Sequence, residues 1–126
     1  MTRRVTSIAP EAPLEDVART LATTRYGGLP VVDRDERVVG FVSETDVVAA
    51  LLRPLPPETP AAAIMSKPAI VIDEFATSDE VISVLRESHI HHLPVVRQDR
   101  LVGIITPNDV LRFFVRHVLP QPPDAG

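Results

Sequence analysis

The 126-residue sequence contains no cysteine and no tryptophan, and it has only four Phe and one Tyr. Without cysteine the chain can form no disulfide, no thiolate nucleophile and no Cys-based zinc site. Val, Leu, Ile and Ala must therefore build the hydrophobic core. No apolar run approaches the ~20 residues of a membrane-spanning helix, and the first ten residues lack the apolar core of a secretory signal. We therefore expect a soluble, cytoplasmic protein with no membrane partner.

The charge pattern and the missing motifs argue against two further classes. The formal net charge is −4, so no broad basic surface attracts nucleic-acid phosphates, and we expect no nucleic-acid partner. The sequence also lacks a Gly-x-Ser-x-Gly motif, a Gly-rich phosphate loop with its Lys, and a pair of carboxylates placed around a cleft. We therefore predict no catalytic residues and no enzymatic activity.

What the sequence does contain is an internal repeat. Residues 26–47, YGGLPVVDRDERVVGFVSETDV, return at residues 90–110 as IHHLPVVRQDRLVGIITPNDV. A shift of 64 positions superposes the two Leu-Pro-Val-Val segments, and a one-residue gap near Asp35 then aligns Asp46 with Asp109. Duplicated units tolerate such length changes at polar turns. The repeat predicts two units, residues 1–53 and 65–119, a Pro- and Ala-rich linker (54–64), and a Pro-rich tail (120–126) that we expect to fray.

Each unit has the same predicted order of elements, β-α-β-β-α, which indicates a mixed α/β (α+β) fold. A short opening strand (5–8 or 70–72) precedes a helix, whose second copy carries apolar residues at helical spacing, namely Val81, Ile82 and Leu85. Two strands joined by a polar turn then indicate a hairpin (29–32 with 38–42, and 93–96 with 101–105), and a final helix follows (44–52 and 107–118). Thr77 to Glu80 match a capping box, whereas Pro13 stands at the equivalent of Thr77 in the first unit.

The repeated segment ends in both units with Gly-h-h-[Ser/Thr]-x-x-Asp, where h is apolar. Ser43 and Thr106 stand where a strand becomes a helix, and Asp46 and Asp109 fall at the third helical position, so helix capping alone explains these residue types. The same geometry suits a binding site. Exposed N–H groups at a helix start attract phosphate, and the Asp can accept hydrogen bonds from the two hydroxyls of a ribose. The motif by itself fits both interpretations.

With these motifs the chain resembles a tandem pair of CBS (cystathionine β-synthase) domains, also called a Bateman module. The resemblance rests on Leu-Pro-Val-Val, the hairpin and the Gly-h-h-[Ser/Thr]-x-x-Asp motif occurring twice in the same order, and on the opening IMSKPAIVI. It covers residues 1 to about 118. It implies a regulatory module in which two pseudo-symmetric units pack through their sheets and leave two clefts. In this family the clefts often bind AMP, ADP or ATP, and sometimes S-adenosylmethionine.

The resemblance also implies which residues line each cleft. The cleft anchored by Asp109 would use Thr106, Asn108 and Ile104 from the second unit and Thr6, Tyr26, Gly27 and Gly28 from the first. His91 and His92 occupy the family's basic position and are the predicted phosphate ligands. The cleft anchored by Asp46 would use Ser43, Thr45, Phe41, Ile70 and Ile90. Because Gly27 and Gly28 replace the basic pair there, we expect the Asp109 cleft to be the better phosphate-bearing site.

Two further features leave alternatives open. His89 and His91 would share one face of an extended segment, and imidazoles suit zinc or nickel, but no nearby carboxylate or Cys completes a ligand set, so we expect no metal. The final helices contain VVAALL and VLRFFV, which are apolar on more than one side and fit either core packing or a homodimer interface. The resemblance favours the homodimer. An alternative function is therefore a ligand-free interaction module that holds itself or an effector protein together.

Overall fold

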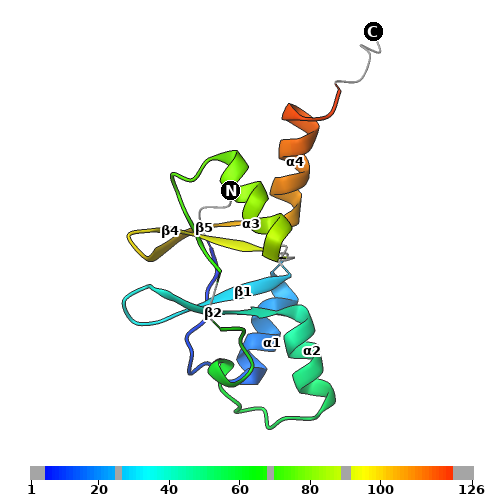
Figure 1. The fold of residues 1–126 in the computed structure, drawn as a ribbon. Coiled ribbons are helices and arrows are strands. Elements are labelled where there is room, and N and C mark those ends of the chain that lie inside the picture. The colour runs from blue at the N-terminus through cyan, green and yellow to red at the C-terminus, as the bar shows by residue number, and fades with distance from the viewer. Residues whose placement is uncertain (1–4, 25–26, 68–69, 89–91, 121–126) are drawn as a thin grey trace.

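The computed structural model describes residues 5–24, 27–67, 70–88 and 92–120. Two small β-sheets, one from each unit, lie face to face in the middle of the molecule, and helices cover the outer side of each sheet (Figure 1). We call the boundary between the two sheets the seam. This arrangement confirms the predicted α+β fold, in which two β-α-β-β-α units pack through their sheets.

The elements follow one another in the order that the repeat predicts. In the first unit they are α1 (Leu14–Thr23), β1 (Gly28–Val32), β2 (Val38–Ser43) and α2 (Glu44–Leu52). A short 3-10 turn, η1 (Ala61–Ala63), lies between the units. In the second unit they are β3 (Ile72–Asp73), α3 (Ser78–Ser88), β4 (Leu93–Arg97), β5 (Arg100–Ile105) and α4 (Pro107–His117).

The hairpin loops contain the one-residue difference between the units. β4 and β5 are joined by Gln98 and Asp99, both at positive φ (49° and 67°), as the twist of a two-residue hairpin requires. The loop of the first unit is longer. There Asp33 Oδ1 accepts hydrogen bonds from the backbone N–H groups of Asp35 (2.9 Å) and Arg37 (3.0 Å). A short acidic side chain therefore accommodates the additional residue within the turn.

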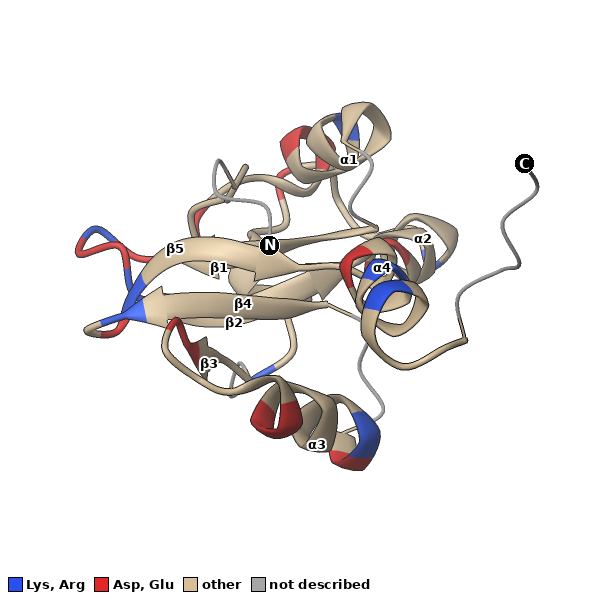
Figure 2. Cartoon of the chain, turned by 90° about the horizontal axis from the view of Figure 1, so that it is seen from above, with Lys and Arg blue, Asp and Glu red and all other residues tan. Residues whose placement is uncertain are grey.

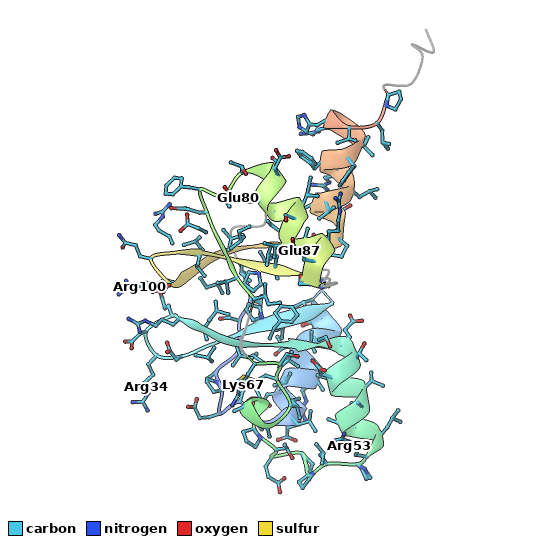
Figure 3. The ribbon with its side chains drawn as sticks, viewed as in Figure 1. Arg34, Arg53, Lys67, Glu80, Glu87 and Arg100 are labelled. Atoms are coloured by element: carbon cyan, nitrogen blue, oxygen red, sulfur yellow. The ribbon has the colours of Figure 1, made fainter. Side chains whose placement is uncertain are left out.

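The tips of the two hairpins are hydrogen-bonded to each other across the seam. The Leu101 N–H donates to the Glu36 carbonyl at 3.0 Å, and Arg37 and Arg100 form an antiparallel bridge. Glu36 reaches this position at a φ of 65°. Arg34 and Arg100 accordingly lie at the same edge of the molecule (Figure 3). Backbone hydrogen bonds thus join the two units at this edge.

The opening strands differ from the predicted ones in extent. Among residues 5–8 of the first unit only Ile8 pairs with the sheet, through a parallel bridge to Val31, and a turn follows it at once. In the second unit β3 is confined to Ile72–Asp73. The Asp73 carboxylate accepts the Phe75 N–H at 2.9 Å and so turns the chain away from the sheet. Both predicted strands therefore begin too early: residues 5–7 and 70–71 do not pair with the described strands, and the turns after Ile8 and Asp73 end the pairing on the other side.

The first helices of the two units begin differently, as Pro13 and Thr77 predict. The Thr77 hydroxyl accepts a first-turn N–H of α3 at 3.2 Å. Pro13 provides no such side-chain cap. Instead the Leu14 N–H donates to the Thr59 carbonyl at 2.7 Å, and the Glu15 N–H donates to the Pro57 carbonyl at 3.0 Å. Carbonyl groups of the linker therefore take the place of a hydroxyl cap in the first unit.

The two helix pairs also differ in burial. α1 and α2 together bury five side chains in the core, whereas no residue of α3 or α4 is fully buried. The predicted apolar stripe of α3, with Val81 and Leu85, is only half-buried. No helix within the described ranges is long and apolar enough to span a bilayer. The two units are therefore more alike in sequence than in how deeply their helices are buried.

Candidate functional site

Ser43 and Asp46 lie where β2 runs directly into α2. Ser43 is the last residue of β2 and the N-cap of α2. Its Oγ accepts a hydrogen bond from the Asp46 N–H at 3.1 Å, and Asp46 Oδ2 accepts one from the Ser43 N–H at 2.9 Å. This is a capping box, so the first copy of the motif has the structural role that the sequence predicts.

Thr106 and Asp109 form the same box at the start of α4. Asp109 Oδ2 accepts hydrogen bonds from the Thr106 N–H (2.8 Å) and from the Thr106 hydroxyl (3.1 Å). The Asp109 N–H donates a hydrogen bond to the Thr106 hydroxyl oxygen at 3.4 Å. Burial raises the pKa of the Asp109 carboxyl, but the hydrogen bonds that it accepts from the Thr106 N–H and hydroxyl lower it, and the pKa lies below its ordinary value. Asp109 is thereby held as a carboxylate, the form that accepts hydrogen bonds from ligand hydroxyls.

Few backbone N–H groups at these helix starts remain for an anion. In α2 the Gly27 carbonyl accepts the N–H of the first helical residue, Glu44, at 3.0 Å, and the Ser43 hydroxyl accepts the N–H of the third, Asp46. In α4 the first helical residue, Pro107, has no N–H, and the Thr106 hydroxyl accepts the N–H of the third, Asp109. Only the second-position N–H, of Thr45 or Asn108, has no acceptor in the part of the chain that the structure describes. A phosphate site therefore needs basic side chains in addition to the helix terminus.

The structure adds Arg112, which lies beside Asn108 of the predicted site. In the amide orientation that its contacts favour, the Asn108 side-chain oxygen accepts hydrogen bonds from Arg112 Nη2 (3.2 Å) and Nε (3.3 Å). Arg112 is exposed, and Ala49 stands at the corresponding position of α2. Sequence reasoning missed Arg112 because it lies beyond the repeated motif. Its i,i+4 spacing from Asn108 was the signal that could have found it.

Four predicted site residues from both units meet at the seam. The Phe41 ring of β2 stacks on the His92 imidazole, with ring centroids 5.8 Å apart and planes inclined by 29°. Gly27 and Gly28 make room for these rings, because a Cβ on Gly28 would lie 2.5 Å from the Phe41 ring and one on Gly27 would lie 3.1 Å from His92. Gly27 also has a φ of +77°, which favours glycine. The resemblance divides these residues between two clefts, whereas the structure brings them into contact.

The remaining predicted residues lie in different environments. Ile104 is fully buried, Ile70 is 41% exposed, and Thr6 and Thr45 are exposed. Ile104 therefore contributes to the interior in this arrangement and presents no surface to a ligand. Tyr26, Ile90 and His91 lie outside the described residues, as does His89 of the metal hypothesis. Among the residues that are described, no group of three His, Cys, Asp or Glu could hold a metal ion.

A cavity of about 260 Å³ opens between α3 and α4, inside the second unit. Its lining is largely apolar and includes Val81, Leu85, Val110 and Phe113. Asp109 also lines this cavity, and no other predicted site residue does. The cavity is therefore distinct from the seam, where the sequence predicts the ligand.

Comparison with known families identifies the repeat. The CBS domain model matches this chain twice, over residues 1–53 and 61–116. The chain belongs to the CBS-domain family. CBS-domain pairs are generally regulatory modules, and the two matches correspond to the two structural units of this CBS pair.

Two relatives illustrate the settings in which such pairs occur. Hypoxic response protein 1 of Mycobacterium tuberculosis is 29% identical over 123 residues, which cover 96% of this chain and 86% of the relative. Inosine-5′-monophosphate dehydrogenase of Thermoplasma acidophilum is 38% identical over 111 residues, which cover 86% of this chain and 21% of the enzyme. This CBS pair therefore resembles only a small part of that enzyme.

Solved structures agree with the fold. Hypoxic Response Protein I with two coordinated zinc ions superposes with a TM-score of 0.79 at 29% identity, covering 95% of each chain. CBSX2 in complex with AMP superposes with a TM-score of 0.79 at 25% identity, covering 92% of this chain and 93% of CBSX2. Both similarities extend over nearly the whole molecule, so the likeness includes the packing of the two units on each other.

Proposed function

We propose that this CBS pair is a regulatory module that binds an adenine nucleotide of the AMP, ADP or ATP class between its two units. The observation that carries the proposal is the pair of capping boxes, which orient Asp46 and Asp109 at the starts of α2 and α4. A carboxylate has about four lone-pair positions, so it can cap a helix and also accept hydrogen bonds from ribose hydroxyls. The AMP complex of CBSX2 supports an adenine nucleotide as the ligand class.

We assign the phosphate-bearing site to the Asp109 cleft. The residues of this cleft that can bind phosphate are His92 and its sequence neighbour His91, which precede β4, and Arg112, whose guanidinium lies beside Asn108. The other cleft has glycines in place of the histidines and Ala49 in place of Arg112. The proposed Asp109 cleft comprises Asp109, Thr106, Asn108, Thr6, Tyr26, Gly27, Gly28, His91 and His92, and it no longer includes the fully buried Ile104. The weaker one comprises Asp46, Ser43, Thr45, Phe41, Ile70 and Ile90.

Calorimetric titration and thermal denaturation of the full chain with AMP, ADP, ATP and S-adenosylmethionine test the proposal. A ligand present at about 100 times its Kd stabilises the folded state by about 2.7 kcal/mol. For a chain of this length that raises Tm by roughly 10 °C. GMP is the matched control, because it keeps the ribose and phosphate and changes the base. Failure of every adenine compound to bind would leave the ligand-free interaction module as the function.

A second function, self-association, is favoured by exposed apolar residues on α2 and α4. We define the α2–α4 face by Val48, Leu51, Leu52, Leu111 and Val115, each of which is at least 50% exposed. Both helices lie on the same side of the molecule (Figures 1 and 2). We propose that this face pairs with the same face of a second copy, as in a two-fold homodimer. Nucleotide occupancy would signal to an effector protein by changing this packing or that of the two units.

Light scattering at micromolar concentration is expected to give twice the chain mass of 13.8 kDa. The double variant Leu52→Glu/Leu111→Glu should be monomeric, because dimerisation would bury unpaired carboxylates. Phe75→Glu is the matched control, since Phe75 is 84% exposed but lies outside the α2–α4 face. A monomeric unmodified chain, or a double variant that still dimerises, would refute this interface.

A further inference from the structure

The helix pairs of the two units differ in how completely their apolar positions are covered. Shifted by 64 and 63 positions, Val81 and Val110 correspond to Val17 and Val47 of the first unit. Val17 and Val47 are 0% and 5% exposed, whereas Val81 and Val110 are half-buried and line the cavity between α3 and α4. The same positions are therefore closed in the first unit and open in the second.

Leu14 and the linker close the first unit. Leu14, the first residue of α1, is 0% exposed within the core cluster of this unit. Ala61 of the linker is 0% exposed in the same cluster, and Leu55 packs against it. The linker passes beneath α1 and α2 in Figure 1. In the second unit Ser78 stands at the position of Leu14 and lines the cavity, so a shorter side chain leaves space that leucine fills in the first unit.

The lining of the α3–α4 cavity combines apolar side chains with a single charged group. Among the described residues that form this lining, Asp109 has the only ionisable side chain and Ser78 the only hydroxyl. The apolar part comes from three elements, namely Val81, Ile82 and Leu85 of α3, Ile105 of β5, and Val110 and Phe113 of α4. Each of these residues belongs to the second unit, so the cavity is separate from the seam. A ligand that fits it therefore needs an apolar body and one group that pairs with a carboxylate.

Asp109 gives the cavity a fixed negative charge. Its pKa lies below the ordinary value, so the carboxyl is ionised at neutral pH. The Thr106 N–H and hydroxyl hold Oδ2 in place at 2.8 and 3.1 Å. A carboxylate has about four lone-pair positions, so it can accept further hydrogen bonds. Beside apolar walls the attraction between opposite charges is stronger than in water. An ammonium group is therefore favoured here, and a ligand carboxylate is repelled.

The volume of the cavity sets the size of its ligand. An apolar cavity of about 150 Å³ holds one benzene ring, so the α3–α4 cavity of about 260 Å³ accommodates a ring with a short side chain. We propose that this cavity is a second ligand site, which binds a small organic amine. The apolar group of the amine packs between Val81, Leu85 and Phe113. Its ammonium pairs with Asp109 and donates a hydrogen bond to the Ser78 hydroxyl.

The probe for this site is 2-phenylethylamine, which has one ring and one ammonium group. Titration of the full chain, followed through the methyl NMR signals of the protein, should shift the signals of Val81, Leu85 and Val110 until the site is saturated. A Kd of about 1 mM is expected for a compound of this size. The alcohol 2-phenylethanol keeps the ring but has no charge, so it should bind at least about fivefold more weakly. Phenylacetate carries a carboxylate and should leave these signals unchanged.

Ser78→Leu tests the position of the ligand, because it introduces the residue that fills this space in the first unit. We expect it to weaken the binding of 2-phenylethylamine at least about tenfold, and to raise Tm by about 4 °C as the leucine becomes partly buried. Ser83→Leu is the matched control, since Ser83 lies on the same helix but is exposed and outside the cavity lining. It should bind the probe as the unmodified chain does. Asp109→Asn should reduce the affinity for the amine to about that for 2-phenylethanol.

Unshifted cavity signals, or undiminished binding in Ser78→Leu, overturn the site, and phenylacetate that binds as tightly as the amine overturns the ligand class. The inference rests on the proposed function at one point, because Asp109 also belongs to the proposed nucleotide cleft. Saturating AMP should therefore raise the apparent Kd of the amine at least about fivefold. AMP that binds without this effect overturns the pairing of the amine with Asp109. Calorimetry with AMP alone tests the nucleotide function separately, since the amine titration requires no nucleotide.

Discussion

Replacing Asp109 by Asn is expected to weaken AMP binding by about 10- to 100-fold while α4 stays capped. The Asn side-chain oxygen can still accept the Thr106 N–H, which Asp109 Oδ2 accepts at 2.8 Å. The variant loses the negative charge, and with it a charge-assisted hydrogen bond to ribose worth about 1.5–3 kcal/mol. That free energy corresponds to the expected loss of affinity. Isothermal titration calorimetry with AMP measures it.

Two companion variants separate binding from capping. Asp109→Ala removes the cap as well as the charge and should cost a further 0.5–2 kcal/mol or so of folding stability. Asp46→Asn is the matched change in the first unit and should weaken AMP binding less, because glycines and Ala49 replace the basic residues there. Equal losses in the two Asn variants would refute the ranking of the clefts. No loss in either variant would mean that the carboxylates serve only as caps.

Gly28→Ala is expected to lower the free energy of unfolding by about 1–3 kcal/mol, the usual cost of overpacking a filled site. The added Cβ would lie 2.5 Å from the Phe41 ring and 3.0 Å from the Val42 carbonyl oxygen. The ring can move only by giving up its stacking on His92, and the carbonyl belongs to β2, whose pairing with β1 includes Gly28 itself. Thermal denaturation should show a fall in Tm of roughly 4–12 °C.

A double-mutant cycle with Phe41→Ala identifies the cause of this loss. Once the ring is removed, Gly28→Ala should cost less than about 1 kcal/mol, because the two positions are in contact and their effects are not additive. Additive effects would mean that the Phe41 ring is not what excludes the Cβ. The expected coupling would establish that Gly28 is required for the stacked rings at the seam.

The features predicted best from sequence are those that depend on a few consecutive residues. Both capping boxes form between residues three positions apart, and α2 has the predicted bounds. The hairpins also agree to within a few residues, because turn residues and alternating apolar positions act locally. The opening strand of the second unit shows where such patterns mislead. Ile70 and Val71 are apolar and favour a strand, but the pairing of β3 with β4 begins only at Ile72.

The candidate site was predicted only in part because it combines residues that are far apart in the sequence. Phe41 and His92 are assigned to different clefts by their place in the repeat, yet they stack on each other. Ile104 has the expected apolar character but is fully buried. Arg112 was missed because it lies outside the motif. Each of these outcomes depends on the relative position of two units, which no local pattern contains.

The amino-acid sequence by itself determined the doubled order of strands and helices and the helix caps with their two carboxylates. These follow from hydrogen bonds and backbone preferences within a few residues. Only the tertiary structure decided which rings meet at the seam and why one helix pair is covered while its repeat is open. Those features depend on how whole elements pack, because equivalent residues such as Val17 and Val81 have different neighbours in the folded protein.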